Sequence, residues 1–463
     1  MAFRLGSLGV SPPHAARESA ILRRIRKRNV RVGIGVGFLR GLIALRCVDW
    51  SPHSSEGVPC GRLLRLGGLC SHWALLGYYL EMDSSGIALA LSGGGARGAY
   101  QVGFLRHLCR RYPDLPVEIL TGASAGAVNA VQLANHPGSF CESVEDLTRS
   151  WQSLSVDQVF RVDAASLLPR GLRWIAQLSL LGGRRNVPQA QGLVDTSPLR
   201  KFLYRALGTE DGSLPGIQKN LDEGSLRAVA LSTTHYGSGS TVVFCQGEEV
   251  EAWERPQRHS VMRDMTVEHV MASAALPLFF PAVELNGQWF GDGGLRLHSP
   301  LAPAVHLGAR KIVAVSTRAE TVGDVVRLPL PPSKYPTPAQ VVGVLFNSVF
   351  LDLLDQDALR LERINRLIRS GASPEKTGLR PVDLLILRPS VELSKIAQDY
   401  EPELPPLFRF LSRRSGAGET KSSDVLSMLM FQGNFLTRII ELGESDADAR
   451  TDEIARFIES QES

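Results

Sequence analysis

The chain has 463 residues, 44% of them hydrophobic, and a formal net charge of +4, the composition of an ordinary globular protein. Residues 1–81 hold twelve basic and four acidic residues, so the remainder carries a net charge of about −4. This net negative charge argues that the part of the chain after residue 81 does not bind a polyanion. No basic stripe interleaved with aromatic residues indicates a nucleic-acid partner.

Cysteine spacing and hydropathy argue against further classes of protein. The six cysteines form no C-x-x-C pair, which argues against a metal site and a disulfide framework and favours a reducing compartment. No uncharged apolar run reaches 18 residues, and the stretch Leu66–Leu80 is too short to cross a bilayer. We therefore expect no transmembrane span, no metal and no cofactor, in a cytoplasmic or peripheral membrane protein.

Residues 1–81 show no periodic pattern long enough for a domain. Residues 17–28 could form a basic amphipathic helix, which would suit a targeting segment or a membrane-surface anchor. Alternatively, Met82 is the true start and the preceding residues are a disordered or non-native extension. Either way, we expect residues 1–81 to lie outside the enzyme.

Two glycine-rich turns follow apolar strands in the next forty residues. A strand at 87–91 leads into Gly93-Gly94-Gly95-Ala96-Arg97-Gly98 and a helix over 98–111. A strand at 117–120 leads into Gly122-Ala123-Ser124-Ala125-Gly126 and a helix over 124–134. A serine framed by glycines between a strand and a helix is typical of a nucleophile elbow, which exposes the hydroxyl at a strand end. The pair of turns predicts a nucleophile beside an oxyanion hole.

The first turn also fits the dinucleotide-binding pattern G-x-G-x-x-G through Gly93, Gly95 and Gly98. That interpretation needs an acidic residue at the end of the second strand to hold the ribose. The second strand ends in Thr121-Gly122, and Glu118 lies near its beginning. The dinucleotide interpretation is therefore the weaker one.

A third motif lies at Asp292-Gly293-Gly294, after the segment Ala272-Ser273-Ala274-Ala275-Leu276-Pro277 and an apolar strand. In this order and separation, the glycine loop, the serine elbow and the Asp-Gly-Gly turn resemble the signatures of the patatin-like phospholipases. The segment Gly192–Leu199 also fits this family. The resemblance covers roughly residues 87 to 320, and more weakly the chain up to about 390.

The resemblance implies a serine acyl hydrolase that cleaves acyl esters of phospholipids or related lipids at a membrane surface. Ser124 would be the nucleophile and Asp292 the proton acceptor of a Ser–Asp dyad. Gly93, Gly94 and Gly95 would form the oxyanion hole. The supporting residues would be Arg97 and Gly98 for the loop or an anion, Gly122 and Gly126 for the elbow, and Gly293 and Gly294 for the turn.

Two alternatives stay open. An esterase of the α/β-hydrolase type would need a histidine after Asp292, and only His298 and His306 follow it. A non-catalytic lipid-binding protein could keep the same fold.

The alternation of strand-like and helix-like segments along the chain predicts an α/β fold, with a mainly parallel sheet sandwiched by helices and a helical C-terminal extension. We expect a catalytic domain over 87–305, the remainder of the core over 306–400 and a helical tail over 401–463. The apolar, arginine-bearing insert 167–185 is either an interfacial flap or a helix packed on the core. The other predicted elements are helices at 143–154, 265–274, 339–369, 423–442 and 451–460, strands at 226–232, 241–245, 311–316 and 382–387, and a proline-rich linker or loop at 328–338.

Overall fold

The computed structural model describes residues 86–161, 192–248, 250–297, 300–319, 353–371, 379–404 and 423–460. The chain divides into two units, Met1–Asp83 and Ser84–Ser463, and all of the described residues belong to the second. The N-terminal segment 1–81, the insert 167–185, the proline-rich segment 328–338 and His298 lie outside the described residues.

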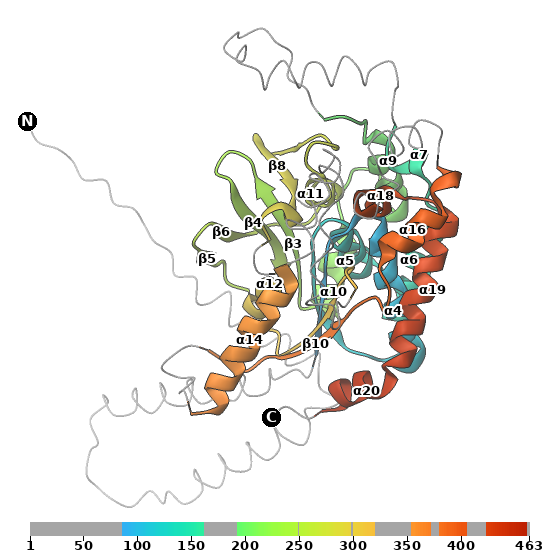
Figure 1. The fold of residues 1–463 in the computed structure, drawn as a ribbon. Coiled ribbons are helices and arrows are strands. Elements are labelled where there is room, and N and C mark those ends of the chain that lie inside the picture. Colours follow the sequence, from blue (N-terminus) through green and yellow to red (C-terminus); the bar gives the residue numbers. More distant parts are fainter. Residues whose placement is uncertain are drawn as a thin grey trace, which may run out of the picture. The chain divides into compact units, whose positions relative to one another are not determined.

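A ten-stranded mixed sheet forms the centre of this unit (Figure 1). Its main path runs β10-β9-β1-β2-β3-β4-β6-β5, and the pairs from β10 to β3 are all parallel. A hairpin of β7 and β8 joins it because β8 pairs antiparallel with β3. The strands are β1 Ile87–Leu91, β2 Val117–Gly122, β3 Ala228–His235, β4 Ser240–Gly247, β5 Glu254–Arg255, β6 Arg258–Met262, β7 Val283–Leu285, β8 Gln288–Asp292, β9 Lys311–Val315 and β10 Asp383–Leu387.

The central strands are buried on both faces, as their continuous apolar sequences predict. Leu89 and Leu91 of β1 belong to a core shared with the helices on one side of the sheet. Ala88 and Ala90 belong to a second core with Leu354 of α14. Figure 1 shows α14 on one side of the sheet and α4, α6 and α19 on the other. The predicted layered α/β fold is confirmed.

The longer helices are α4 Ala99–Arg111, α5 Ala125–Asn135, α6 Phe140–Gln152, α9 Ser197–Ala206, α10 Pro215–Glu223, α14 Leu353–Arg369, α19 Gly433–Ala449 and α20 Thr451–Glu459. The shorter ones are η1 Gly95–Gly98, α7 Val156–Val159, α11 Val267–Ser273, η2 Gly293–Arg296, α12 Ala302–His306, α16 Leu393–Asp399, η3 Glu401–Glu403 and α18 Ser423–Leu429. The sequence pattern did not predict α9, α10, α16 or β7, whereas the apolar strand expected before the Asp292 turn is β8.

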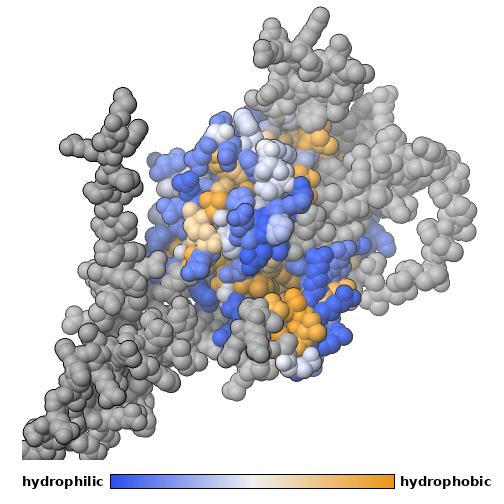
Figure 2. All heavy atoms as spheres, turned by 90° about the vertical axis from the view of Figure 1, so that its left-hand side faces the viewer, coloured by the Kyte–Doolittle hydropathy of each residue, from blue (hydrophilic) through white to orange (hydrophobic). Residues whose placement is uncertain are grey.

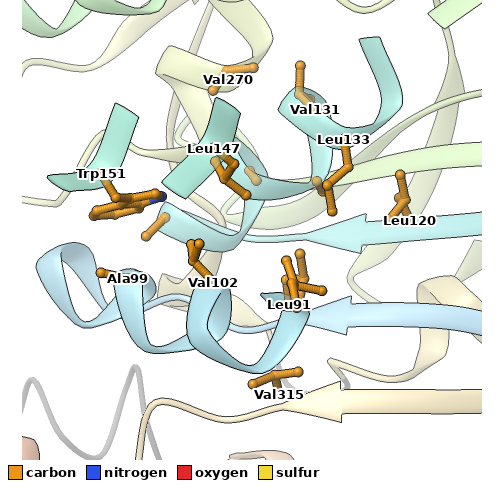
Figure 3. Close-up of a cluster of buried hydrophobic side chains, with 14 of the residues drawn as sticks. Leu91, Ala99, Val102, Leu120, Val131, Leu133, Leu147, Trp151, Val270 and Val315 are labelled. Carbon is orange, nitrogen blue, oxygen red and sulfur yellow. The ribbon is translucent and has the colours of Figure 1, made fainter. Parts of the chain in front are cut away.

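The larger core lies under the two glycine turns. Figure 3 shows Leu91 of β1, Val102 of α4, Val131 of α5, and Leu147 and Trp151 of α6 in one apolar cluster. These side chains come from the two strand–turn–helix units and from the helix that follows them. Their burial fixes the strand ends from which the glycine turns project.

The helix predicted over 423–442 is wrong in one respect, because it is two helices, α18 and α19. Gln432 has an extended backbone, with φ −129° and ψ 129°, and Gly433 begins the second helix. The turn lets Phe431 pack edge-on against Phe160, with ring centroids 6.4 Å apart, while Met430 is fully buried. Tertiary packing therefore overrides the helical periodicity here.

Figure 2 shows a face that is largely hydrophilic, with apolar side chains gathered low on it, at the height of α14 in Figure 1. On α14, Leu359 and Leu367 are exposed. Within the described ranges, no helix has the length and hydropathy needed to cross a membrane.

Candidate active site

Ser124 occupies a strained turn between β2 and α5. Its backbone has φ 54° and ψ −125°, a conformation that residues other than glycine rarely adopt and that is characteristic of functional sites. Glycine is required two residues later, at position 126, because a Cβ atom added to Gly126 would lie 2.1 Å from the carbonyl oxygen of Leu91. Gly122, at the end of β2, is the other framing glycine. The turn places Ser124 at the N-terminus of α5, where the helix dipole favours negative charge.

A hydrogen-bonded serine supports this turn from α11. The backbone amide of Ser124 donates to the hydroxyl of Ser273 at 3.1 Å, and that hydroxyl donates to the carbonyl oxygen of Ser232 at 2.7 Å. Ser273 is fully buried. Ser273 lies in the segment 272–277, which resembles the patatin-like family in sequence, but the sequence did not predict this hydrogen bond.

Asp292 reaches the same place from the last residue of β8. Strand β3 lies between the serine elbow and Asp292. Its Leu231 pairs with the end of β2, and its Thr233 pairs with Asp292. The hydroxyl of Thr234 donates to the main-chain oxygen of Asp292 at 2.8 Å. The amide of Gly294 donates to Oδ1 of Asp292, also at 2.8 Å, so the Gly293–Gly294 turn caps the carboxyl.

The carboxyl of Asp292 is completely buried. Burial raises its pKa from 3.8 to about 7, and the Ser124 hydroxyl and the Gly294 amide partly offset this shift. The Ser124 hydroxyl is thus a close neighbour of the carboxyl, although Oδ2 completes no hydrogen bond with any described residue. Catalytic hydrogen bonds are often loose before substrate binds. The structure therefore brings a serine hydroxyl next to a carboxyl whose pKa suits proton transfer near neutral pH.

The glycine loop lies directly against Ser124. A Cβ added at Gly93 would be 3.0 Å from the Cβ of Ser124. The hydroxyl of Thr317, after β9, donates to the carbonyl oxygen of Gly93 at 2.8 Å. Among the described residues, no main-chain carbonyl accepts a hydrogen bond from the amides of Gly93, Gly94 or Gly95.

A chain of buried polar side chains supports the loop from below. Asn129 of α5 donates to the carbonyl oxygen of Gly98 at 3.1 Å and to Oε1 of Gln101 at 2.9 Å, and accepts from Nε1 of Trp151 at 2.8 Å. Gln101 donates to the carbonyl oxygen of Ser92 at 2.7 Å. Sequence analysis missed this network. The only signal was polar residues on helices that must otherwise be apolar.

Arg97 is buried rather than a surface side chain, with 1% of it exposed. Its Nε donates to the hydroxyl of Ser427 on α18 at 2.7 Å. The side chain therefore links the glycine loop to a helix that lies 330 positions further along the chain.

An apolar cavity opens at Ser124, as expected of a site for an apolar ligand. Its walls come from α5, α6, α9, the segment after α11, and α18 with the turn that follows it. Representative lining residues are Val128, Leu154, Phe202, Phe280, Met428 and Phe431. Ser124 is one of the few polar residues that line it.

His306, one of the two candidates for a catalytic histidine, lies in a different environment. Its ring stacks on Trp253 with centroids 4.3 Å apart. Burial, followed by the charges of Arg255, Arg258 and Arg380, lowers its pKa to about 4. Asp292 is not among the groups that shift it. In the described ranges, no cluster of three or more histidine, cysteine or acidic side chains could hold a metal ion.

Comparison with solved structures finds distant likenesses. Human GIVD cytosolic phospholipase A2 shares 12% identity at a TM-score of 0.41, over 81% of this chain and 60% of that one. VipD from Legionella pneumophila shares 11% identity at a TM-score of 0.32, over 80% of this chain and 66% of that one. The type III effector protein ExoU shares 18% identity at a TM-score of 0.24, over 50% and 43%. This chain thus spans about 60% of the length of the human protein.

No curated protein sequence matches the chain. A family model does match, over residues 89–305, and its family is described as patatin-like phospholipase. The matched segment begins in β1 and includes the glycine loop, the serine elbow and Asp292. Residues 89–305 of this chain therefore form a domain of the patatin-like phospholipase family.

Proposed function

We propose that this protein is a serine acyl hydrolase that cleaves acyl esters of phospholipids or related lipids through Ser124 and Asp292. The observation that carries the proposal is that Ser124 lines an apolar cavity and its hydroxyl lies next to the buried Asp292 carboxyl, whose pKa is about 7. The family match makes a lipid ester the expected substrate class.

In the acylation step, the hydroxyl oxygen of Ser124 attacks the ester carbonyl carbon while Asp292 takes the hydroxyl proton. The tetrahedral intermediate collapses to an acyl-enzyme, and protonated Asp292 returns the proton to the leaving alcohol. In the second step, water attacks the acyl-enzyme and Asp292 again takes the proton. Collapse of the second tetrahedral intermediate releases the carboxylic acid, and protonated Asp292 returns its proton to the Ser124 oxygen.

Two features would stabilise the negative charge on the oxyanion. The glycine loop lies beside Ser124 at Gly93, and its amides have no main-chain acceptor among the described residues. The N-terminus of α5 begins at the next residue. The apolar cavity would hold the acyl chain.

The test uses the full chain and two substrates, a short-chain p-nitrophenyl ester and mixed phospholipid vesicles. We expect the wild-type protein to hydrolyse both and Ser124→Ala to hydrolyse neither. A fluorophosphonate probe should add its mass to the peptide that contains Ser124. Hydrolysis that persists in Ser124→Ala would overturn the assignment of the nucleophile. A folded wild-type protein that binds fatty acid but neither hydrolyses ester nor reacts with the probe would be a lipid-binding protein instead.

A further inference from the structure

Helix α18 and the turn after it contact the proposed catalytic site. They lie outside the family match, which ends at residue 305. Gly95, in the glycine loop, has φ 58°, and a Cβ added to it would lie 2.2 Å from the carbonyl oxygen of Met428. Only glycine fits between this backbone conformation and that close contact. The main chain of α18 therefore touches the loop that would hold the oxyanion.

A side-chain contact strengthens this attachment. Arg97 and Ser427 are both buried, and the guanidinium Nε donates to the hydroxyl at 2.7 Å. Hydrogen bonds from charged donors are shorter and stronger than those between neutral groups. The loop is thus held by main-chain packing and by a charged hydrogen bond to the same helix.

The same segment lines the cavity. Met428, Leu429 and Phe431 are part of its wall, together with residues of α5 and α9. Met428 packs in a small apolar cluster with Leu276 and Phe280, and Phe431 packs against Phe160. One short stretch of chain therefore contacts both the expected site of chemistry and the expected site of the acyl chain.

The core holds this stretch in place through α19. Phe435, Leu436 and Ile439 of that helix are fully buried in the main hydrophobic core. Helices α4 and α19 pack closely, since a Cβ added at Gly103 would lie 1.9 Å from the carbonyl oxygen of Ile440. Helix α18 thus continues into a helix that is built into the core.

We propose that residues 427–431 complete the active site as its specificity element. Ser427 acts as a positioning residue for the oxyanion loop through Arg97, and Met428 and Phe431 set the length of acyl chain that the cavity accepts. This inference rests on the proposed function, and it assigns the substrate-selecting role to a part of the chain that the family match does not include.

Phe431→Ala and Met428→Ala test the cavity wall. Hydrolysis of p-nitrophenyl butyrate, octanoate, laurate and palmitate gives a chain-length profile as ratios of kcat/KM. Removing either side chain should raise the palmitate-to-butyrate ratio by roughly tenfold, because a few methylenes in an apolar pocket are worth that much. The control is Leu436→Ala, because Leu436 is also buried but does not line the cavity, and its ratio should match wild type. Unchanged ratios in folded Phe431→Ala and Met428→Ala would overturn the proposal.

Ser427→Ala tests the positioning role. We expect kcat to fall by roughly tenfold for every chain length while KM and the chain-length ratio stay at wild-type values, since only the loop geometry is disturbed. Ser427→Thr keeps the hydroxyl and should restore kcat. A folded Ser427→Ala variant with wild-type kcat would refute this part.

A binding readout separates this inference from the proposed function. Fatty acids of the same chain lengths can be titrated into the Ser124→Ala protein and into its double variant with Phe431→Ala. A shift in the preferred chain length supports the role of residues 427–431, even if the wild-type protein proves to hydrolyse no ester. An unchanged preference in the double variant counts against it, whatever the hydrolysis assay shows.

Discussion

The backbone amide of Ser124 donates a hydrogen bond of 3.1 Å to the hydroxyl of Ser273, so a side chain on another helix holds the residue with the strained backbone. Ser273 in turn donates to Ser232 on β3, the strand that also pairs with Asp292. One serine therefore connects the elbow to the strand that positions the carboxyl.

The first prediction follows from this contact. Ser273→Ala removes the acceptor for the Ser124 amide, so the elbow should spend less time in its productive conformation. One neutral hydrogen bond is worth about 1 kcal/mol, which predicts a loss of roughly fivefold in kcat with little change in KM. The control is Ser260→Ala, because Ser260 is also buried and its hydroxyl accepts a main-chain amide, that of Trp253, at 2.8 Å. A wild-type kcat in Ser273→Ala would show that the contact only stabilises the fold.

The sequence predicted those elements that are determined by neighbouring residues in the chain. Strands β1 and β9 are continuous apolar runs, and Ser124 and Asp292 stand in glycine-flanked turns. Periodicity shows which face of an element is buried but says nothing about its partner. Ser273 is 149 positions from Ser124, and Ser427 is 330 positions from Arg97, so neither contact leaves a pattern in the sequence. The break between α18 and α19 was missed for the same reason, because it depends on where Phe431 packs.

The second prediction concerns the pH dependence of hydrolysis. Asp292 accepts a proton only when it is ionised, and burial sets its pKa at about 7. The value of kcat/KM should therefore rise from pH 5, reach half of its maximum near pH 7 and level off above about pH 8, measured with a short-chain ester across pH 5–9. Asp292→Asn should lower kcat by roughly 10²–10⁴-fold, the usual worth of general-base catalysis, and abolish this rise.

Two histidine variants serve as controls for that experiment. His306→Ala and His298→Ala should each keep most of the activity and the same pH profile, because the dyad uses no histidine. If either were as inactive as Asp292→Asn, a Ser–Asp–His triad would replace the dyad. For His306 the structure itself argues against a catalytic role, since its ring stacks on Trp253 among arginine charges.

The third prediction concerns stability. Folded Asp292 has a pKa of about 7 against 3.8 in its ordinary state, so between these values the folded protein holds a proton that the unfolded chain has released. The contribution of this group to the free energy of unfolding is therefore fully present below pH 4 and is lost as the pH rises to about 7. Asparagine does not titrate, and its side-chain oxygen can still accept the Gly294 amide. Asp292→Asn should thus be both inactive and more stable than wild type at alkaline pH.

The measurement is urea unfolding of the two proteins at pH 5 and pH 8. The difference in free energy of unfolding, variant minus wild type, should be larger at pH 8 by roughly 2–3 kcal/mol, from about two pKa units at 1.36 kcal/mol each. Comparing the two pH values cancels any change in packing that the substitution causes. A difference independent of pH would mean that the carboxyl is ionised in the folded protein throughout this range.

The fourth prediction separates the support of the glycine loop from general core stability. Asn129→Ala leaves the indole of Trp151 and the carbonyl of Gly98 without their buried partner, which should lower the free energy of unfolding by roughly 2–4 kcal/mol. Because Gly98 ends the glycine turn, kcat per folded molecule should fall as well. Asn220→Ala is the matched control, since that buried side chain donates to the carbonyls of Ala134 and His136, away from the loop. It should lose stability and keep kcat. Equal kcat in the two variants would show that the Asn129 network stabilises the core without positioning the loop.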